Sequence, residues 1–269
     1  MFVELPKYVS SSDKDPRYCQ SLYIDNELDL KNVINELMAH NDKYIYRGIC
    51  DASYKMYTSS QRLWFEDNER MLHLGCKNYY DTIECIIKLT ASLPEVQQYI
   101  QQNNLPANDF QILAMLQHFA SPSPILDFSN NVLKGLLFSV DNMPAWTDNG
   151  TNVLEDYVSL YYISRNIDWG QKLKDNADLL YQQVRLEYSN IFFLPIGNNS
   201  FYNNTKDIPL VEVVNTVCHT NYFHCINIRK HLAPVIQSVF LQPNGITHDS
   251  VYCIDNSVSD QLRTIFDKI

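Results

Sequence analysis

The order of helix-like and strand-like segments constrains this chain more than any other feature of its sequence. Apolar residues recur at helical spacing in 29–39, 110–119 and 132–140, whereas short runs rich in Tyr, Ile and Phe at 43–47 and 157–163 have the composition of strands. Long helical stretches separate the early strands, and the later strands follow one another more closely. This order favours an α+β fold with a mixed or antiparallel sheet and long helical insertions.

The individual elements can be placed from their end signals. Asp29 is a candidate cap for the helix 29–39, Pro94 suits the first turn of a helix over 94–102, and 66–90 is predicted to be helical with Gly75 as a weak point. Gly135 within the buried helix 132–140 indicates close packing. The remaining expected elements are strands at 191–194 and 217–228 and helices near 230–242 and 258–268.

The sequence predicts a single domain. Its 269 residues allow one large domain or two small ones, but no linker-like segment divides them. We expect a single domain over 1–269, with a motif-bearing core at about 41–195 and a C-terminal strand and helical part at about 196–269.

Glycine is scarce, and this excludes several kinds of site. The chain has only 7 Gly and contains no GxGxxG, GxxxxGK[ST], GxSxG or HExxH pattern. Such patterns form the common phosphate-binding loops, nucleophile elbows and zinc-protease helices. A catalytic function therefore requires a different kind of site.

Charge and hydropathy suggest where the protein works. The formal net charge is −10, so no long-range attraction to nucleic acid or to an anionic membrane is expected from the chain as a whole, although a local basic groove stays open. No segment has the roughly 20 apolar residues of a membrane helix, and the first residues lack the apolar stretch of a signal peptide. We expect a soluble cytoplasmic protein without a membrane partner.

The cysteines and histidines include one group with zinc-ligand chemistry. Cys218-His219 and His224-Cys225 enclose the segment CHTNYFHC, but this spacing matches no familiar zinc motif. The segment also reads as a strand, in which adjacent side chains point to opposite faces. We therefore expect no metal site, and free thiols in a reducing compartment.

Two segments carry a resemblance to a known family. Tyr46-Arg47-Gly48 lies within YIYRGICDASYKMYTSSQR, and Arg62 follows. The second segment, LAMLQHFASPSPILDFSNNVLKGLLFSV, contains Gln117-His118, then Pro122 and Leu126-Asp127. In this order and spacing the two segments resemble the FRG family, named for its Phe/Tyr-Arg-Gly motif. A third, weaker similarity is RLEYSNIFF, where Arg185 and Phe193 match.

The chain departs from the family pattern at several positions. Ser123-Pro124 stands where the family has Thr-Arg, and Ala120 replaces a glycine. Ser189-Asn190-Ile191 replaces a Gln-rich turn. An anion-binding arginine is thus lost, so we expect a divergent member of the family with altered or lost activity.

The resemblance implies one enzymatic reading. Arg-Gly strand ends are similar to those of bacterial ADP-ribosyltransferases, in which an Arg holds the NAD pyrophosphate, a Ser supports the nicotinamide side and a Glu stabilises the oxocarbenium ion. By this analogy Arg47 binds phosphate, Ser129 is the supporting hydroxyl and Glu187 the acid. The substrate would be a protein or a nucleic acid, with NAD as the source of ADP-ribose.

The same residues also have a structural reading. Arg47 can form a buried ion pair with Asp127 or Asp51, Ser129 can cap the following helix, and His118 can cap helix carbonyls. We expect Arg47, Gln117, His118 and Asp127 to form one polar cluster, as a binding site or as a structural network. The full set of ligand-binding or structural candidates is Tyr46, Gly48, Asp51, Arg62, Gln117, His118 and Asp127.

The aromatic content supports a second functional reading. With 18 Tyr and 12 Phe, the chain can present rings to a partner as a non-catalytic module that binds protein or nucleic acid, in a bacterial toxin or phage-defence setting. That reading predicts exposed rings gathered on one face. A nuclease is less favoured, because no pair of Asp and Glu residues indicates a metal site.

Overall fold

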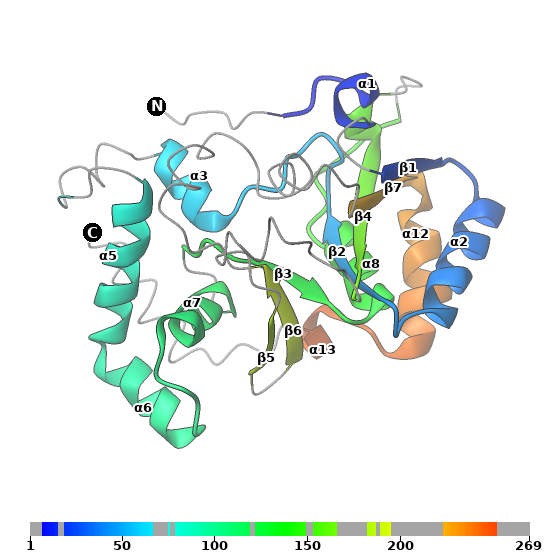
Figure 1. The fold of residues 1–269 in the computed structure, drawn as a ribbon. Helices are drawn as coiled ribbons and strands as arrows, with labels where there is room; N and C mark the ends of the chain where they lie inside the picture. Colours follow the sequence, from blue (N-terminus) through cyan, green and yellow to red (C-terminus); the bar gives the residue numbers. More distant parts are fainter. Residues whose placement is uncertain are drawn as a thin grey trace.

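A mixed β-sheet forms the centre of the protein. The computed structural model describes residues 7–15, 19–66, 75, 79–118, 122–148, 153–165, 182–186, 189–194 and 223–251. Within these ranges one seven-stranded sheet has the order β1-β7-β4-β2-β3-β6-β5 (Figure 1). Its strands are β1 (Cys19–Ile24), β2 (Tyr44–Ile49), β3 (Leu126–Ser129), β4 (Tyr157–Ser164), β5 (Gln182–Leu186), β6 (Ser189–Leu194) and β7 (Phe223–Arg229).

The strand directions make the sheet mixed. β1 runs parallel to β7, whereas the other neighbouring strands pair in antiparallel fashion. Together with the helices, this confirms the α+β class and the mixed sheet. β1 was not expected, because its sequence CQSLYI lacks the strict alternation of a half-buried strand.

One face of the sheet is covered by helices from the middle of the chain. These are α5 (Tyr79–Ala91), α6 (Pro94–Gln102) and α7 (Asp109–His118), which Figure 1 places on the left. Ile45 and Tyr161 from the sheet share a hydrophobic cluster with Ile86 and Met115 from these helices. The short helix α3 (Ser59–Glu66) precedes them in the chain.

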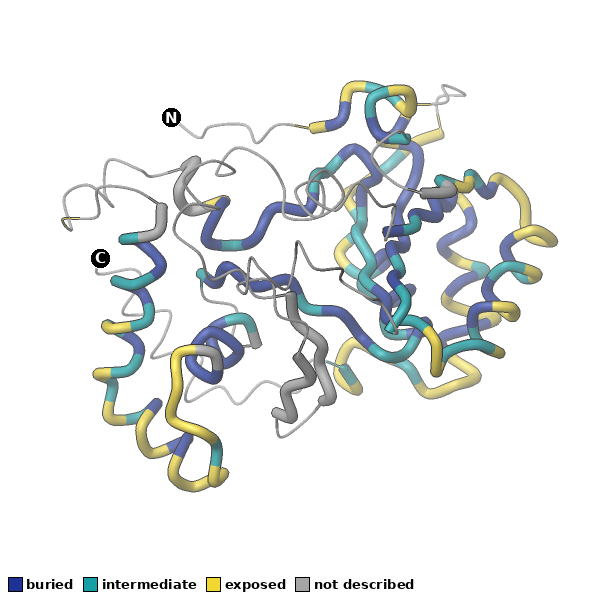
Figure 2. The backbone as a smooth tube through the Cα atoms, in the orientation of Figure 1, coloured by how far each residue is buried: buried dark blue, intermediate teal, exposed yellow. Residues whose placement is uncertain are grey.

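The other face is covered by helices from the N-terminal, middle and C-terminal parts of the described chain. α2 (Glu27–Ala39) and α8 (Val132–Val140) pack there on Tyr46 and Leu160. In Figure 2 the inward side of α2 is buried and its outward side exposed. Because neighbouring residues of β2 alternate between the two clusters, the sheet separates two cores. The C-terminal part of this layer contains η3 (Lys230–Leu232), α12 (Ala233–Val235), η4 (Ile236–Leu241), η5 (Gln242–Asn244) and α13 (His248–Val251).

Most sequence-predicted elements have the expected type, with different ends. α2 begins two residues before the predicted start, because the Asn26 side chain accepts a bond from Asp29 N, so Asp29 is not the cap. Pro94 occupies the first turn of α6, as predicted. The Asn108 side chain accepts a bond from Gln111 N at the start of α7.

Two predicted helices are wrong in detail. The helix expected over 66–90 is not continuous: Gly75, the predicted weak point, has φ 83°, and α5 starts at Tyr79. The segment 230–242 is helical but irregular, since 3₁₀, α and π turns follow one another in it, and Pro234 has no N–H to donate. The segments 217–222 and 258–268 lie outside the described residues.

The segment considered for zinc shows the expected alternation where it is described. His224 stacks on Tyr162 with ring centroids 4.7 Å apart, whereas Cys225 belongs to the cluster on the opposite face. Two adjacent side chains on opposite faces of β7 cannot bind the same ion. Cys218 and His219 lie outside the described residues.

Candidate functional site

Strand β2 presents the Tyr-Arg-Gly sequence between two other strands. Tyr46 pairs with Ser129 of β3 on one side and with Tyr162 of β4 on the other. Tyr46 is fully buried, and its hydroxyl donates to the carbonyl of Leu37 in α2, 3.2 Å away. Burial raises the pKa of Tyr46 above its usual value. Tyr46 therefore fixes the strand to the α2 and α8 layer rather than facing a ligand.

Gly48 is required by helix packing. A Cβ placed on Gly48 would lie 2.1 Å from Gly135 O and 2.4 Å from Ser139 N, both in the backbone of α8. Gly135 in turn leaves room for Tyr46 Cβ, which would lie 2.9 Å from a Cβ added there. The close approach to the motif glycine is thus made by α8, not by a ligand.

Arg47 points to the opposite face and is hydrogen bonded to β3. Its Nη1 lies 2.5 Å from Asp127 Oδ1 and 2.8 Å from the carbonyl oxygen of Asp127. The Gln117 Nε2 of α7 donates to the same Oδ1 at 2.9 Å. We call Arg47, Gln117 and Asp127 the Arg47 cluster. It joins β2 to the last turn of α7 and to β3, which both come much later in the sequence.

The Arg47 cluster is only partly closed to solvent. The side chains of Arg47 and Asp127 keep 22% and 26% of their exposure. Two other atoms of the cluster, Arg47 Nε and Gln117 Oε1, are buried without a hydrogen-bond partner among the described residues. In the part of the chain that the structure describes, Arg47 Nε is thus a hydrogen-bond donor without a partner, and Gln117 Oε1 is an acceptor without one. Buried polar atoms normally have a hydrogen-bond partner.

The other predicted site residues lie at different places. Asp51 contacts Lys230 of η3 and not Arg47, with Lys230 Nζ 3.0 Å from Asp51 Oδ2, so the alternative pairing of Arg47 with Asp51 is wrong. Asp51 also accepts bonds from the amide and hydroxyl of Ser53. Arg62 lies on α3 with an exposed side chain, and the described contacts of the Arg47 cluster do not include it.

Ser129 contributes to the turn before α8. Its Oγ accepts a bond from Asn131 N at 3.1 Å, and the Asn131 side chain accepts from Leu133 N at the helix start. Asn131 is therefore the N-cap of α8, and the hydrogen bond from its backbone N–H to Ser129 helps to position it. Ser129 keeps 6% of its exposure. The side chain of His118, and Glu187 altogether, lie outside the described residues.

One of the family positions that differ in this chain, Ser123, makes structural contacts. Ser123 is fully buried, and its backbone N–H donates to the Ser59 hydroxyl of α3, 2.8 Å away. Its own hydroxyl donates to the carbonyl of Leu113 in α7 at 3.2 Å. Ser123 therefore joins α3 to α7 beside Pro124, which stands where the family has an arginine.

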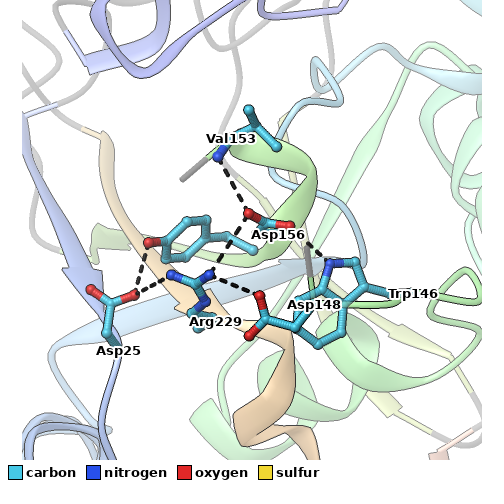
Figure 3. A network of polar contacts seen from close by, with 7 residues as sticks. Asp25, Trp146, Asp148, Val153, Asp156 and Arg229 are labelled. Atoms are coloured by element: carbon cyan, nitrogen blue, oxygen red, sulfur yellow. Dashed lines mark hydrogen bonds and ion pairs between the residues drawn. The ribbon is translucent and has the colours of Figure 1, made fainter. Parts of the chain in front are cut away.

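Two polar networks were not expected from the sequence. One surrounds Arg229, which lies 3.2 Å from Asp148, 3.6 Å from Asp25 and 3.9 Å from Asp156 (Figure 3). Trp146 donates its indole N–H to Asp156 in the same network. The other surrounds the buried Lys14 of α1 (Ser11–Lys14). Each joins segments distant in sequence, so no local spacing could have revealed it.

The fold and the Arg47 cluster define an α+β protein in which the Tyr-Arg-Gly strand is fixed by α8 on one face and by an aspartate on the other. Residues 42–147 match the model of the FRG domain. The chain therefore contains an FRG domain, and Arg47, Gln117 and Asp127 lie within it. Comparison with curated proteins and with solved structures returned no match. No helix in the described ranges has the length and apolarity needed to span a bilayer.

Proposed function

We propose that this FRG domain binds a nucleotide of the NAD type at the Arg47 cluster and transfers its ADP-ribose to a protein or nucleic acid. The observation that carries the proposal is the pair of unpartnered atoms, Arg47 Nε and Gln117 Oε1. A carboxamide or an amino-bearing ring offers one acceptor and one donor, which is the complementary pair. These atoms fit a polar, uncharged part of a nucleotide beside an arginine.

Arg47 also retains donors for an anion. An arginine has five N–H groups, and the described bonds to Asp127 use Nη1 alone. A phosphate would be bound through Nη2 while Asp127 keeps the guanidinium in place. The partial exposure of Arg47 agrees with this use.

The proposed reaction breaks the bond between nicotinamide and the anomeric carbon of the ribose. Nicotinamide leaves with the bonding electron pair, the acceptor nucleophile forms the new bond to that carbon, and its proton passes to a base. Glu187 is the candidate that stabilises the cationic sugar, and Ser129 is the candidate hydroxyl beside the nicotinamide. Ser129 and Arg47 lie on the neighbouring strands β3 and β2.

Calorimetric titration with NAD tests binding. Gln117→Met removes the carboxamide while leaving the Arg47–Asp127 pair, so we expect weaker NAD binding in a folded variant. Lys88→Ala, which breaks an exposed pair on α5, is the matched control and should bind as wild type. Absence of binding heat in the folded wild type would refute the proposal.

Release of nicotinamide tests the chemistry separately from binding. We expect release by the wild type with a suitable acceptor, and little or none by Glu187→Gln at unchanged NAD affinity. Equal rates in the two proteins would exclude Glu187 from the reaction.

A non-catalytic binding role is the second candidate, and the replacement of the family arginine by Pro124 favours it. A proline side chain has no donor for an anion, so one anion ligand of the family is missing here. NAD binding without nicotinamide release would support this role. Binding through a face of exposed aromatic rings is not favoured. Among the described residues, the exposed large hydrophobic side chains are Val and Leu, not Tyr or Phe.

A further inference from the structure

Lys14 is a lysine whose side chain is completely buried, with 0% exposure. It lies at the end of α1, and its Nζ contacts three oxygens of other segments. These are Ala52 O at 2.9 Å, Ser159 Oγ at 2.8 Å and Asn227 Oδ1 at 2.8 Å. We call these three oxygens, with the rings of Tyr8 and Tyr161, the Lys14 socket.

The oxygens of the Lys14 socket act as acceptors. A carbonyl oxygen such as Ala52 O can only accept, and Ser159 uses its own proton to donate to Asn227 Oδ1 at 2.8 Å. An ammonium group has three N–H donors, whereas a neutral amine has two. The number of acceptors therefore matches the charged form of Lys14.

The charge is stabilised without direct ion pairing. Among the described residues no carboxylate lies within 4.0 Å of Lys14 Nζ, although Asp15 and Asp51 act at longer range. Nζ lies 5.2 Å from the centroid of the Tyr161 ring and 5.8 Å from that of Tyr8. Burial lowers the pKa of Lys14, whereas Cys225, Asp15 and Asp51 act against this shift. The aromatic faces and the oxygen dipoles also favour the ammonium.

Much of the socket is formed independently of α1. Ser159 and Asn227 are paired residues of the neighbouring strands β4 and β7, and Cys225 Sγ also donates to Asn227 Oδ1, at 3.4 Å. Ala52 is held by its own backbone, whose N–H donates to the carbonyl of Tyr157. The oxygens would therefore keep their positions if the Lys14 side chain were removed.

We propose that the Lys14 socket is a binding site for primary ammonium groups, which the chain fills with its own Lys14. The N-terminal segment is then a tethered ligand of the sheet, and a free alkylammonium ion of matching length can take the place of the side chain. The inference is independent of the function proposed for the Arg47 cluster.

Chemical rescue of Lys14→Ala tests the proposal. The substitution removes three methylene carbons and the nitrogen, which together correspond to n-propylammonium. We expect Lys14→Ala to have a Tm several degrees below wild type, and n-propylammonium chloride to raise it in a saturable manner. Propanol, tetramethylammonium chloride and sodium chloride at equal concentration should have no such effect, because each lacks the charge or the N–H donors.

A second variant keeps the test decisive if Lys14→Ala does not fold. Lys14→Met preserves an unbranched apolar side chain without the ammonium, so we expect it to be less stable than wild type and insensitive to n-propylammonium. Wild-type stability of Lys14→Met would overturn the proposal. An equal response of Lys14→Ala to propanol and to n-propylammonium would do the same, because it would show that only volume is being filled.

Discussion

Arg47 and Asp127 are 80 residues apart in sequence, yet a single guanidinium nitrogen of Arg47 contacts both the carboxylate and the backbone carbonyl of Asp127. The contact joins β2 to β3 beside their bridge between Tyr46 and Ser129. Gln117 attaches α7 to the same carboxylate. Arg47 therefore connects β2 to β3 and, through Asp127, to α7, independently of any ligand that it binds.

Removing Arg47 and Asp127 singly and together should reveal their coupling. Both side chains are about a quarter exposed, so the pair lies between an exposed ion pair and a buried one. We expect a coupling free energy of about 1–2 kcal/mol from urea unfolding of wild type, Arg47→Ala, Asp127→Ala and the double variant. The exposed pair of Glu84 and Lys88 provides a control cycle, with about 0.5 kcal/mol or less.

Gly48→Ala should destabilise the protein through α8. The added methyl group would meet the backbone of Gly135 and Ser139, which cannot move without shifting the helix on the sheet. We expect a loss of about 3 kcal/mol in the free energy of unfolding. Gly245→Ala is the control, because a Cβ there meets nothing within 4 Å and only φ 65° is unfavourable, at about 1 kcal/mol. Similar losses at the two positions would contradict the packing argument.

Sequence patterns predicted the elements better than their contacts. Apolar periodicity and β-rich composition each depend on the local environment of a segment. The predicted ends of Val132–Val140 and Tyr157–Ser164 therefore lie close to the observed ones. The structural role of Gly48 depends on Gly135, and that of Lys14 on Asn227, 213 residues away. From the sequence alone, a lysine in a serine-rich segment is predicted to be exposed. The oxygens that accept its hydrogen bonds come from distant segments, which the local sequence does not show.

Asp51→Asn should be more destabilising than a surface charge change. Lys230 and Asp51 keep only 2% and 8% of their side-chain exposure, and the substitution leaves the Lys230 ammonium buried without a counter-charge. We expect a loss of about 3–5 kcal/mol in urea unfolding. Adding Lys230→Met to Asp51→Asn should restore part of that loss, because no buried charge then remains. Failure of the second substitution to restore stability would show that the ion pair is not the cause.

Stability should fall in alkaline solution through Tyr157. Burial, with a bond from its hydroxyl to Asp25 Oδ1, raises the pKa of Tyr157 from 10.0 to about 12. The folded protein then holds the phenolic proton more tightly than the unfolded chain, so this contribution is complete below pH 10 and is lost as the pH rises through about 12. Tyr157→Phe should be less stable at neutral pH by about 1 kcal/mol, because the bond to Asp25 is lost. It should also lose stability less steeply than wild type between pH 10 and pH 12, as measured by urea midpoints together with tyrosinate absorbance. Equal slopes for the two proteins would show that Tyr157 titrates alike in the folded and unfolded states.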